Sequence, residues 1–199
     1  HLGHARRHSN WPAHAQHHFL AEGVWPETAY AENMVYDHGH HGNAILSRLP
    51  ILASHNQDVT HLKFERRGLL HCRIALPDQR VLHCVCVHLS LFGRSRRRQM
   101  HDLSAYLESI APAGTPLIIA GDFNDWQNRA AEHLAARLGL TEVFGNRPVR
   151  SFPAALPLFR LDRIYVRGLA VAEARVHFGP PWSQLSDHAA LSARLICDA

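Results

Sequence analysis

The most informative stretch of this 199-residue chain is PLIIAGDFNDW at residues 116–126, where an apolar run leads directly into a carboxylate and an amide. Residues 117–120 do not alternate with polar side chains, which is typical of a strand covered on both faces. Asp122 and Asn124 then lie on one side of an extended chain, where they can hold a hard cation and orient a water or a phosphate oxygen. An Asx turn, with Asp125 capping the next helix, explains the same residues without any chemistry.

Other apolar runs of the chain predict strands around this one. The expected strands are residues 42–51, 69–76, 81–88, 161–166, 171–178 and 189–196, and the second and third form a hairpin. The strand at 81–88 carries apolar side chains in both directions, so we expect it to be central. Residues 1–41 are rich in His and show no sustained period, which predicts mostly loop with one short helix.

Two helices are predicted, at about residues 94–110 and 127–138. In the first, Met100, Leu103 and Leu107 keep helical spacing. Arginines at 94 and 96–98 crowd its first turn, where the helix dipole disfavours cations. Either they form a solvated charged face, or Arg94 and Arg97 contact an anionic substrate or surface.

The length and composition predict one globular domain spanning residues 1–199, since 46% of the residues are hydrophobic and 19% are charged. A formal net charge of +4 and a pI near 9.2 favour an anionic partner. The charge does not distinguish a nucleic acid from a phospholipid or a small phosphate ester.

The four cysteines, at 72, 84, 86 and 197, are expected to be buried apolar residues rather than disulfide partners, because two of them sit within one predicted strand. This favours a reducing compartment. With no long apolar run for a transmembrane helix and no apolar leader, the default expectation is a cytoplasmic protein. The pairs His17-His18 and His40-His41 match no recognisable zinc pattern, so we expect solvated histidines there.

Polar clusters stand at strand ends or inside apolar strands at four places, and together they predict one convergent pocket. They are His88, Asp122 with Asn124, Asp162, and Asp187 with His188. Each also has a purely structural explanation. His88 can be a satisfied core histidine, Asp187 can cap a turn, and Asp162 can pair with Arg163 or Arg167.

The sequence resembles the endonuclease/exonuclease/phosphatase family, which includes abasic-site endonucleases, pancreatic deoxyribonuclease and bacterial sphingomyelinases. The resemblance covers the chain from about residue 42 to its end, and within the family it is most similar to a small bacterial subgroup of YbhP-type proteins. The matching stretches are GNAILSR at 42–48, VHL at 87–89, GDFN at 121–124, RLDRI at 160–164 and SDH at 186–188.

The resemblance implies an α/β fold, a four-layer sandwich of two packed mixed β-sheets flanked by helices, and hydrolysis of phosphoesters that depends on Mg²⁺ or Mn²⁺. It implies that Asp162 orients His188, which stabilises or protonates the phosphoryl centre. Asp122 would activate the attacking water and Asn124 would position it. The remaining implied roles are phosphate contact by His88, substrate contact by Asn43, and metal binding by Asp187 together with Asp122.

The chain departs from the family at its start. Members begin with a strand ending in Asn and another ending in Gln-Glu, whose Glu is the principal metal ligand, and neither occurs here. We therefore expect that the first strands are missing from this chain, and no physical argument lets Glu22, Glu27 or Glu32 replace that Glu.

Two functions follow from these observations. The first is a metal-dependent phosphodiesterase, phosphatase or nuclease, expected to be a monomer, acting on a nucleic acid or on a phospholipid or small phosphodiester. The second is a noncatalytic module of the same fold that binds a phosphate or a nucleic acid. Absence of the Glu-bearing segment favours the second function, and retention of the other site residues favours the first.

Overall fold

A six-stranded mixed sheet forms the centre of the molecule, with strand order β3-β4-β5-β6-β8-β7. The computed structural model describes residues 16–37, 39–127, 129–145, 147 and 149–197. The strands of this sheet are β3 (Ile51–Asp58), β4 (Gly68–Ala75), β5 (Val81–His88), β6 (Leu117–Asp122), β7 (Thr141–Glu142) and β8 (Asp162–Arg167). Strands β5 and β6 run parallel, and every other pair of neighbours is antiparallel. The polar ends of β5 and β6 are therefore carried to the same edge of the sheet.

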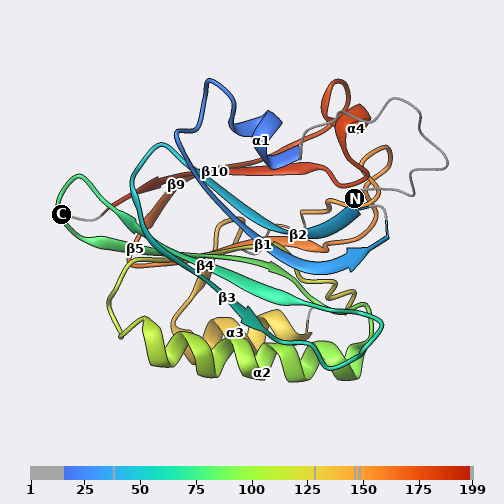
Figure 1. Cartoon of the computed structure of the whole chain (residues 1–199), viewed down its shortest axis with the longest axis horizontal. Coiled ribbons are helices and arrows are strands. Elements are labelled where there is room, and N and C mark those ends of the chain that lie inside the picture. Colours follow the sequence, from blue (N-terminus) through green and yellow to red (C-terminus); the bar gives the residue numbers. More distant parts are fainter. Residues whose placement is uncertain (1–15, 38, 128, 146, 148, 198–199) are drawn as a thin grey trace.

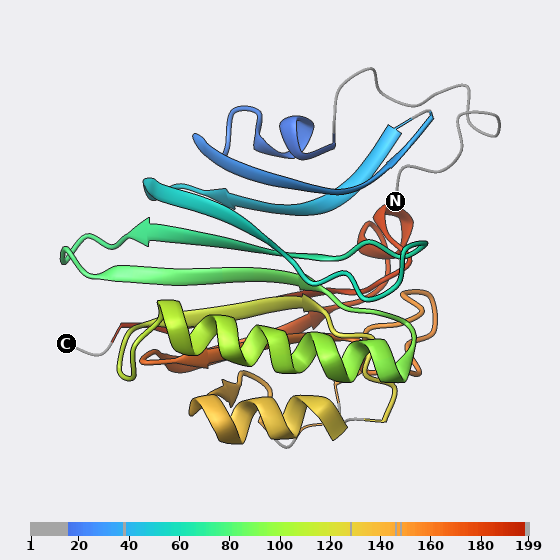
Figure 2. The same cartoon turned by 60° about the horizontal axis from the view of Figure 1, so that its bottom comes forward.

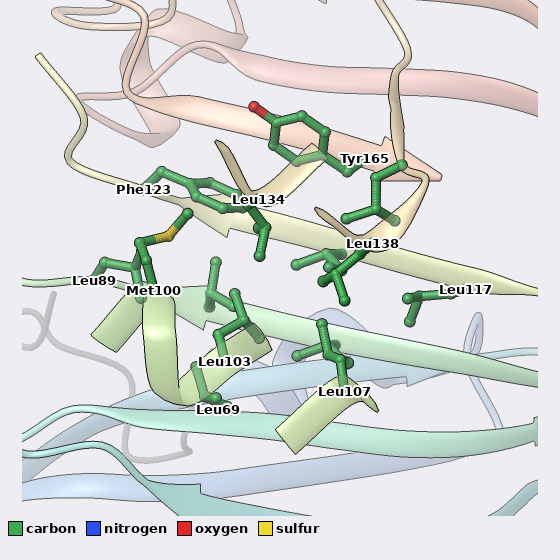
Figure 3. Packing of buried hydrophobic residues seen from close by; sticks show 14 of the residues in the cluster. Leu69, Leu89, Met100, Leu103, Leu107, Leu117, Phe123, Leu134, Leu138 and Tyr165 are labelled. Carbon is green, nitrogen blue, oxygen red and sulfur yellow. The ribbon is translucent and has the colours of Figure 1, made fainter. Parts of the chain in front are cut away.

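Helices α2 (Gly93–Ile110) and α3 (Arg129–Leu138) cover one face of this sheet, which we call the outer face (Figure 2). The helical spacing of Met100, Leu103 and Leu107 places one apolar stripe of α2 against the strands. These side chains pack with residues of β5 and β6 in one continuous cluster, in which Leu103 and Ile119 are completely buried (Figure 3). The outer face is therefore covered by one continuous apolar core.

Two β-hairpins cover the opposite, inner face of the sheet. Strand β1 (Glu27–Tyr36) pairs with β2 (Gly39–Ser47) and packs against β4 and β5, whereas β9 (Ala170–His177) pairs with β10 (Ala190–Ile196) and packs against β6 and β8. Helix α1 (Gln16–Ala21) lies on the far side of the first hairpin, and the short α4 (Trp182–Leu185) precedes β10 (Figure 1). The layers confirm an α/β sandwich of mixed sheets with flanking helices, although in the described chain the second layer is two separate hairpins.

Most predicted elements are confirmed, and the errors lie in the first part of the chain. Residues 27–36 form a strand rather than the expected loop, and the strand expected at 42–51 is β2 followed by a new strand, β3. The inward-facing side chains of β1 include the small Ala29 and Ala31, and β3 is an edge strand that is mostly exposed. Neither strand therefore shows the bulky apolar pattern from which strands are predicted. Residues 1–15 lie outside the described residues.

The described cysteines are all free thiols, as predicted. Cys72 is buried and Cys84 and Cys86 are half-buried on the inner face, but Cys197 is exposed, so its predicted burial is wrong. Burial raises the pKa of Cys72 to about 11, which keeps this thiol protonated and unreactive. Within the described residues, no helix is long and apolar enough to cross a membrane.

Candidate active site

Three of the predicted site residues stand side by side on adjacent strands. His88 ends β5 opposite Asp122, which ends β6, and Asp162 opens β8 on the other side of Asp122. Paired residues of neighbouring strands project from the same face, and alternation along β5 and β6 places these three on the inner face. We call them the row, and we call this end of the sheet the site edge. It is the end at which β5 and β6 finish, opposite the turn between β4 and β5.

His188 completes the cluster from the segment that leads into β10. Its Nδ1 lies 2.7 Å from Oδ2 of Asp162, and its backbone N–H donates to Oγ of Ser186 at 3.1 Å. The backbone N–H of Asp162 donates in turn to Oγ of Ser151. The hydrogen bond that His188 donates to Asp162 raises the pKa of His188, and the charges of Asp162, Asp122 and Asp187 act in the same direction. A histidinium paired through Nδ1 has a second N–H, at Nε2, that can donate a hydrogen bond.

This pairing decides between the explanations left open for Asp162. Arg163 instead meets the carboxylate of Glu142 at 3.3 Å, which also binds Arg160 at 3.0 Å. Arg167 donates to backbone oxygens at the other end of the strand, including that of Ala111 at 2.8 Å. An acid within an apolar strand has acquired a histidine partner rather than an arginine, as expected for a group that orients an imidazole.

The sequence left two explanations for Asp122 and Asn124, an Asx turn and a polar cluster at a site. In the structure these two residues form both. Oδ1 of Asp122 accepts the backbone N–H of Asn124 at 2.8 Å, which is an Asx turn. Asn124 has a positive φ of 47° and its amide donates to the carbonyl of Leu89 at 2.9 Å, so it joins the exits of β6 and β5. Burial raises the pKa of Asp122 to about 6, since the Asn124 hydrogen bond offsets only part of the desolvation.

His88 lies beside Asp122, with Nε2 3.5 Å from Oδ2 of that carboxylate. Burial lowers the pKa of His88 to about 3, and the positive charge of Arg67 acts in the same direction. His88 is therefore a neutral imidazole at pH 7, able to donate or accept a hydrogen bond without adding charge.

Arg67 is a member of this site that the sequence did not reveal. Its guanidinium is 9% exposed and meets Glu65 at 3.1 Å, and its Nε is buried with no hydrogen-bond partner among the described residues. Burial is the largest cause of the lowered pKa values of His88 and His41, and the charge of Arg67 acts in the same direction. The same charge offsets part of the rise that burial causes in the pKa of Asp122. Arg67 belongs to an Arg-Arg-Gly segment that matches no motif. It reaches the site because this segment lies beside β5 in the folded chain.

The remaining predicted residues lie around the row with different degrees of involvement. The Asn43 amide donates to the carbonyls of Gly68 and Cys86, so it fastens β2 to β4 and β5 next to the row. Arg94 and Arg97 are exposed on the first turns of α2, and Arg97 lines a cavity of about 540 Å³ between α2 and α3 that no row residue lines.

Their neighbour Arg96 is buried and donates to the carbonyls of Ser90 and Leu91, which makes it a structural residue. Asp187 is exposed beside His188.

The carboxylates of Asp122 and Asp187 are hard oxygen donors of the kind that Mg²⁺ and Mn²⁺ prefer. Among the residues that the structure describes, however, no three His, Cys, Asp or Glu side chains converge as a metal site. These residues alone therefore do not fit a complete metal centre.

The fold and this histidine–carboxylate site define a class of protein. The chain belongs to the Endonuclease/Exonuclease/phosphatase family, whose model matches residues 5–188, and membership places it among phosphoesterase-type hydrolases. It is 43% identical to the protein YbhP of Escherichia coli K12 over 190 residues, which is 94% of this chain and 75% of that protein.

Two solved structures share the fold at low sequence identity. A mannosyl-6-phosphatase of Bacteroides thetaiotaomicron matches with a TM-score of 0.70 and 15% identity, covering 91% of this chain and 81% of that one. TDP2 of D. rerio, solved with a single-strand DNA product, matches with a TM-score of 0.65 and 19% identity, covering 84% and 76% of the two chains.

Proposed function

We propose that this protein hydrolyses phosphoester bonds with His188 as the acid of the site, held and charged by Asp162. The hydrogen bond of 2.7 Å between these side chains is the observation that carries the proposal. Negative charge develops on the phosphoryl and leaving-group oxygens during hydrolysis, and a positioned imidazolium stabilises it by donating a hydrogen bond or a proton. The raised pKa of His188 favours this charged form.

In this proposal the other row residues prepare the attacking water and the phosphate. Asp122 accepts a hydrogen bond from the water and orients it towards phosphorus, and Asn124 holds Asp122 through its backbone N–H while positioning the water or a phosphate oxygen. His88 contacts the phosphate as a neutral donor. Asn43 on β2 and Arg94 and Arg97 on the first turns of α2 are proposed to contact the substrate.

We further propose that a divalent cation, Mg²⁺ or Mn²⁺, supplies the charge neutralisation that a phosphodiester needs, with Asp122 and Asp187 among its ligands. Because the described donors are too few, no step above runs through the cation. We also propose that residues 1–199 form one domain and that the protein acts as a monomer.

The test compares Asp162→Asn with the wild-type chain in hydrolysis of bis-p-nitrophenyl phosphate, with Mg²⁺ and with EDTA. Loss of the partner leaves the imidazole misoriented and less basic, so kcat/KM is expected to fall by about 10²- to 10⁴-fold. The matched control is Asp78→Asn, which removes an exposed carboxylate at the opposite end of the sheet and is expected to leave the rate unchanged.

The same experiment evaluates the second candidate function, a noncatalytic phosphate-binding module, which the absence of a complete metal site among the described residues favours. A wild-type chain without turnover that still binds inorganic phosphate or a phosphodiester would establish the binding module. Equal rates for wild type and Asp162→Asn would refute the assignment of the acid.

A further inference from the structure

The loops of the site edge expose most of the large apolar side chains that the described chain presents to solvent. Within the described ranges, the other end of the strands exposes fewer such side chains, namely Val24 and Trp25 before β1, Leu52 on β3 and Ile196 on β10. Exposed members at the site edge include Phe64, Leu91, Phe92, Trp126, Leu156 and Leu158. Apolar surface concentrated on one end of a molecule marks a site of interaction.

The loop at 151–159 is the most apolar of these, since SFPAALPLF contains no charged residue. It is held in shape by hydrogen bonds between the main chains of Phe152 and Phe159, and the N–H of Ala154 donates to the carbonyl of Asp187 at 2.7 Å. Leu156 nevertheless remains 68% exposed. The loop is thus ordered by its backbone and keeps its large side chains available for an apolar partner.

This apolar surface reaches the candidate acid. The Phe152 ring lies 4.8 Å from the His188 ring, measured between centroids, and Trp126 lies 4.7 Å from Phe159. On the other side of the row, Phe64 meets Phe92 edge to face at 5.8 Å. A phosphoester bound at the row therefore lies between apolar loops.

Positive charge surrounds the same loops. Arg94, Arg97 and Arg98 are exposed on the first turns of α2, a position that the helix dipole disfavours for cations, and no acidic residue occupies this turn. Lys63 and Arg66 flank Phe64 and are also exposed. Large apolar side chains that alternate with cations are suited to the interface of a bilayer with anionic lipids.

We propose that the site edge binds the surface of an anionic phospholipid bilayer and takes the phosphoester group of a membrane lipid as its substrate. The substrate assignment rests on the proposed phosphoesterase function, whereas the binding does not. A lipid fits better than a nucleic acid because single strands are held on aromatic stacking surfaces, and exposed leucines such as Leu91, Leu156 and Leu158 offer no ring for a base.

The experiment is flotation of the full chain with vesicles of phosphatidylcholine alone or mixed with phosphatidylglycerol. The chain is expected to float with the mixed vesicles, and the double variant Leu156→Ser/Leu158→Ser is expected to bind roughly tenfold more weakly because it buries less apolar surface. Arg94→Gln/Arg98→Gln should weaken binding by roughly 25-fold, since each of the two cations near an anionic surface contributes on the order of fivefold.

Matched controls lie away from the site edge. Leu52→Ser removes an equally exposed leucine at the start of β3, and Arg194→Gln removes an exposed arginine on β10, and both variants should float like the wild type. Trp126→Phe should reduce the quenching of tryptophan fluorescence by brominated lipid, with the remainder coming from the exposed Trp182, whereas Trp25→Phe should leave the quenching unchanged. This second readout is independent of whether any variant is less stable.

Equal flotation of the site-edge variants and the controls would overturn the proposal. The proposal would also be overturned if the chain floats with neither vesicle but binds a single-stranded oligonucleotide that salt releases. The site edge would then bind a nucleic acid. Flotation together with an inactive wild-type chain would refute the phosphoesterase and leave bilayer binding standing. Hydrolysis of bis-p-nitrophenyl phosphate by a chain that does not float would refute bilayer binding and leave the phosphoesterase standing.

Discussion

The two faces of strands β5, β6 and β8 differ in how completely they are covered. On the outer face, Val85, Ile119 and Tyr165 belong to one cluster that runs without interruption under α2 and α3, and their exposure is 2% or less. On the inner face, Cys84 and Ile118 are only half-buried and belong to two different clusters, one under each hairpin.

The position of the site explains what this difference means. The row stands at the end of the inner face, where the covering layer is divided and a substrate can reach the carboxylates. The outer face contributes to stability through continuous apolar packing. A site that binds a substrate must instead be open to solvent. Because side chains alternate along these strands, each strand places its core residues on the outer face and its candidate site residue on the inner face.

The largest effect on stability is expected from Gly121→Ala. Gly121 has φ +141°, and a Cβ there would come within 2.0 Å of the carbonyl oxygen of Val87 on the outer face. Neither backbone can move without breaking the register that aligns the row, so the variant should lose roughly 5 kcal/mol of unfolding free energy in urea.

The control for this change is Gly114→Ala, whose φ of +87° is also unfavourable but whose added Cβ would meet nothing within 4 Å. It should cost only about 1–2 kcal/mol. Equal losses in the two variants would show that the close approach of β6 to β5 is not as described.

A matched pair on β6 measures the two faces directly. Ile119→Ala removes a fully buried side chain from the outer core and should cost roughly 4 kcal/mol, whereas Ile118→Ala on the half-buried inner face should cost about half as much. Urea unfolding of both variants gives the comparison. If Ile118→Ala costs as much as Ile119→Ala, the inner face is as well covered as the outer one.

The smallest expected effect is a pH dependence that comes from the outer face. His71 on β4 is buried there, with Nδ1 3.0 Å from the Tyr106 hydroxyl and Nε2 3.0 Å from Nδ1 of His83. Burial, and then the charges of His83, His55 and Arg73, lower the pKa of His71 to about 4. The unfolded chain therefore binds more protons between about pH 4 and pH 6.5, so stability falls as pH falls through this window.

The contribution of His71 between pH 7.5 and pH 5 should be about 2 kcal/mol. Urea unfolding at both values, for the wild type and for His71→Gln, isolates it, because the variant should have the shallower pH dependence. An unchanged slope in His71→Gln would mean that water reaches the outer face.

Much of the architecture follows from local sequence. The apolar run at 117–120, the helical spacing of Met100, Leu103 and Leu107, and the hairpin around 77–80 are confirmed because each element has a strong period and clear boundaries. Strand β1 was not predicted because its inward-facing side chains include small alanines. Strand β3 was not predicted because most of its side chains face solvent.

The candidate site divides in the same way. Residues with a motif around them, namely His88, Asp122, Asp162 and His188, could be named from the sequence, and the structure places them together. Their roles stay predictions. Arg67 could not be named, because a loop arginine carries no local signal of burial.

The sequence by itself determined most of the central strands and that polar side chains stand at their ends, since periodicity and strand termini are local properties of the chain. The tertiary structure decided which partner Asp162 takes, that Arg96 serves the fold while Arg94 remains exposed, and that scattered phenylalanines and leucines gather on one edge. These outcomes depend on strand order and on which loops meet, and those are set by packing between segments far apart in the chain.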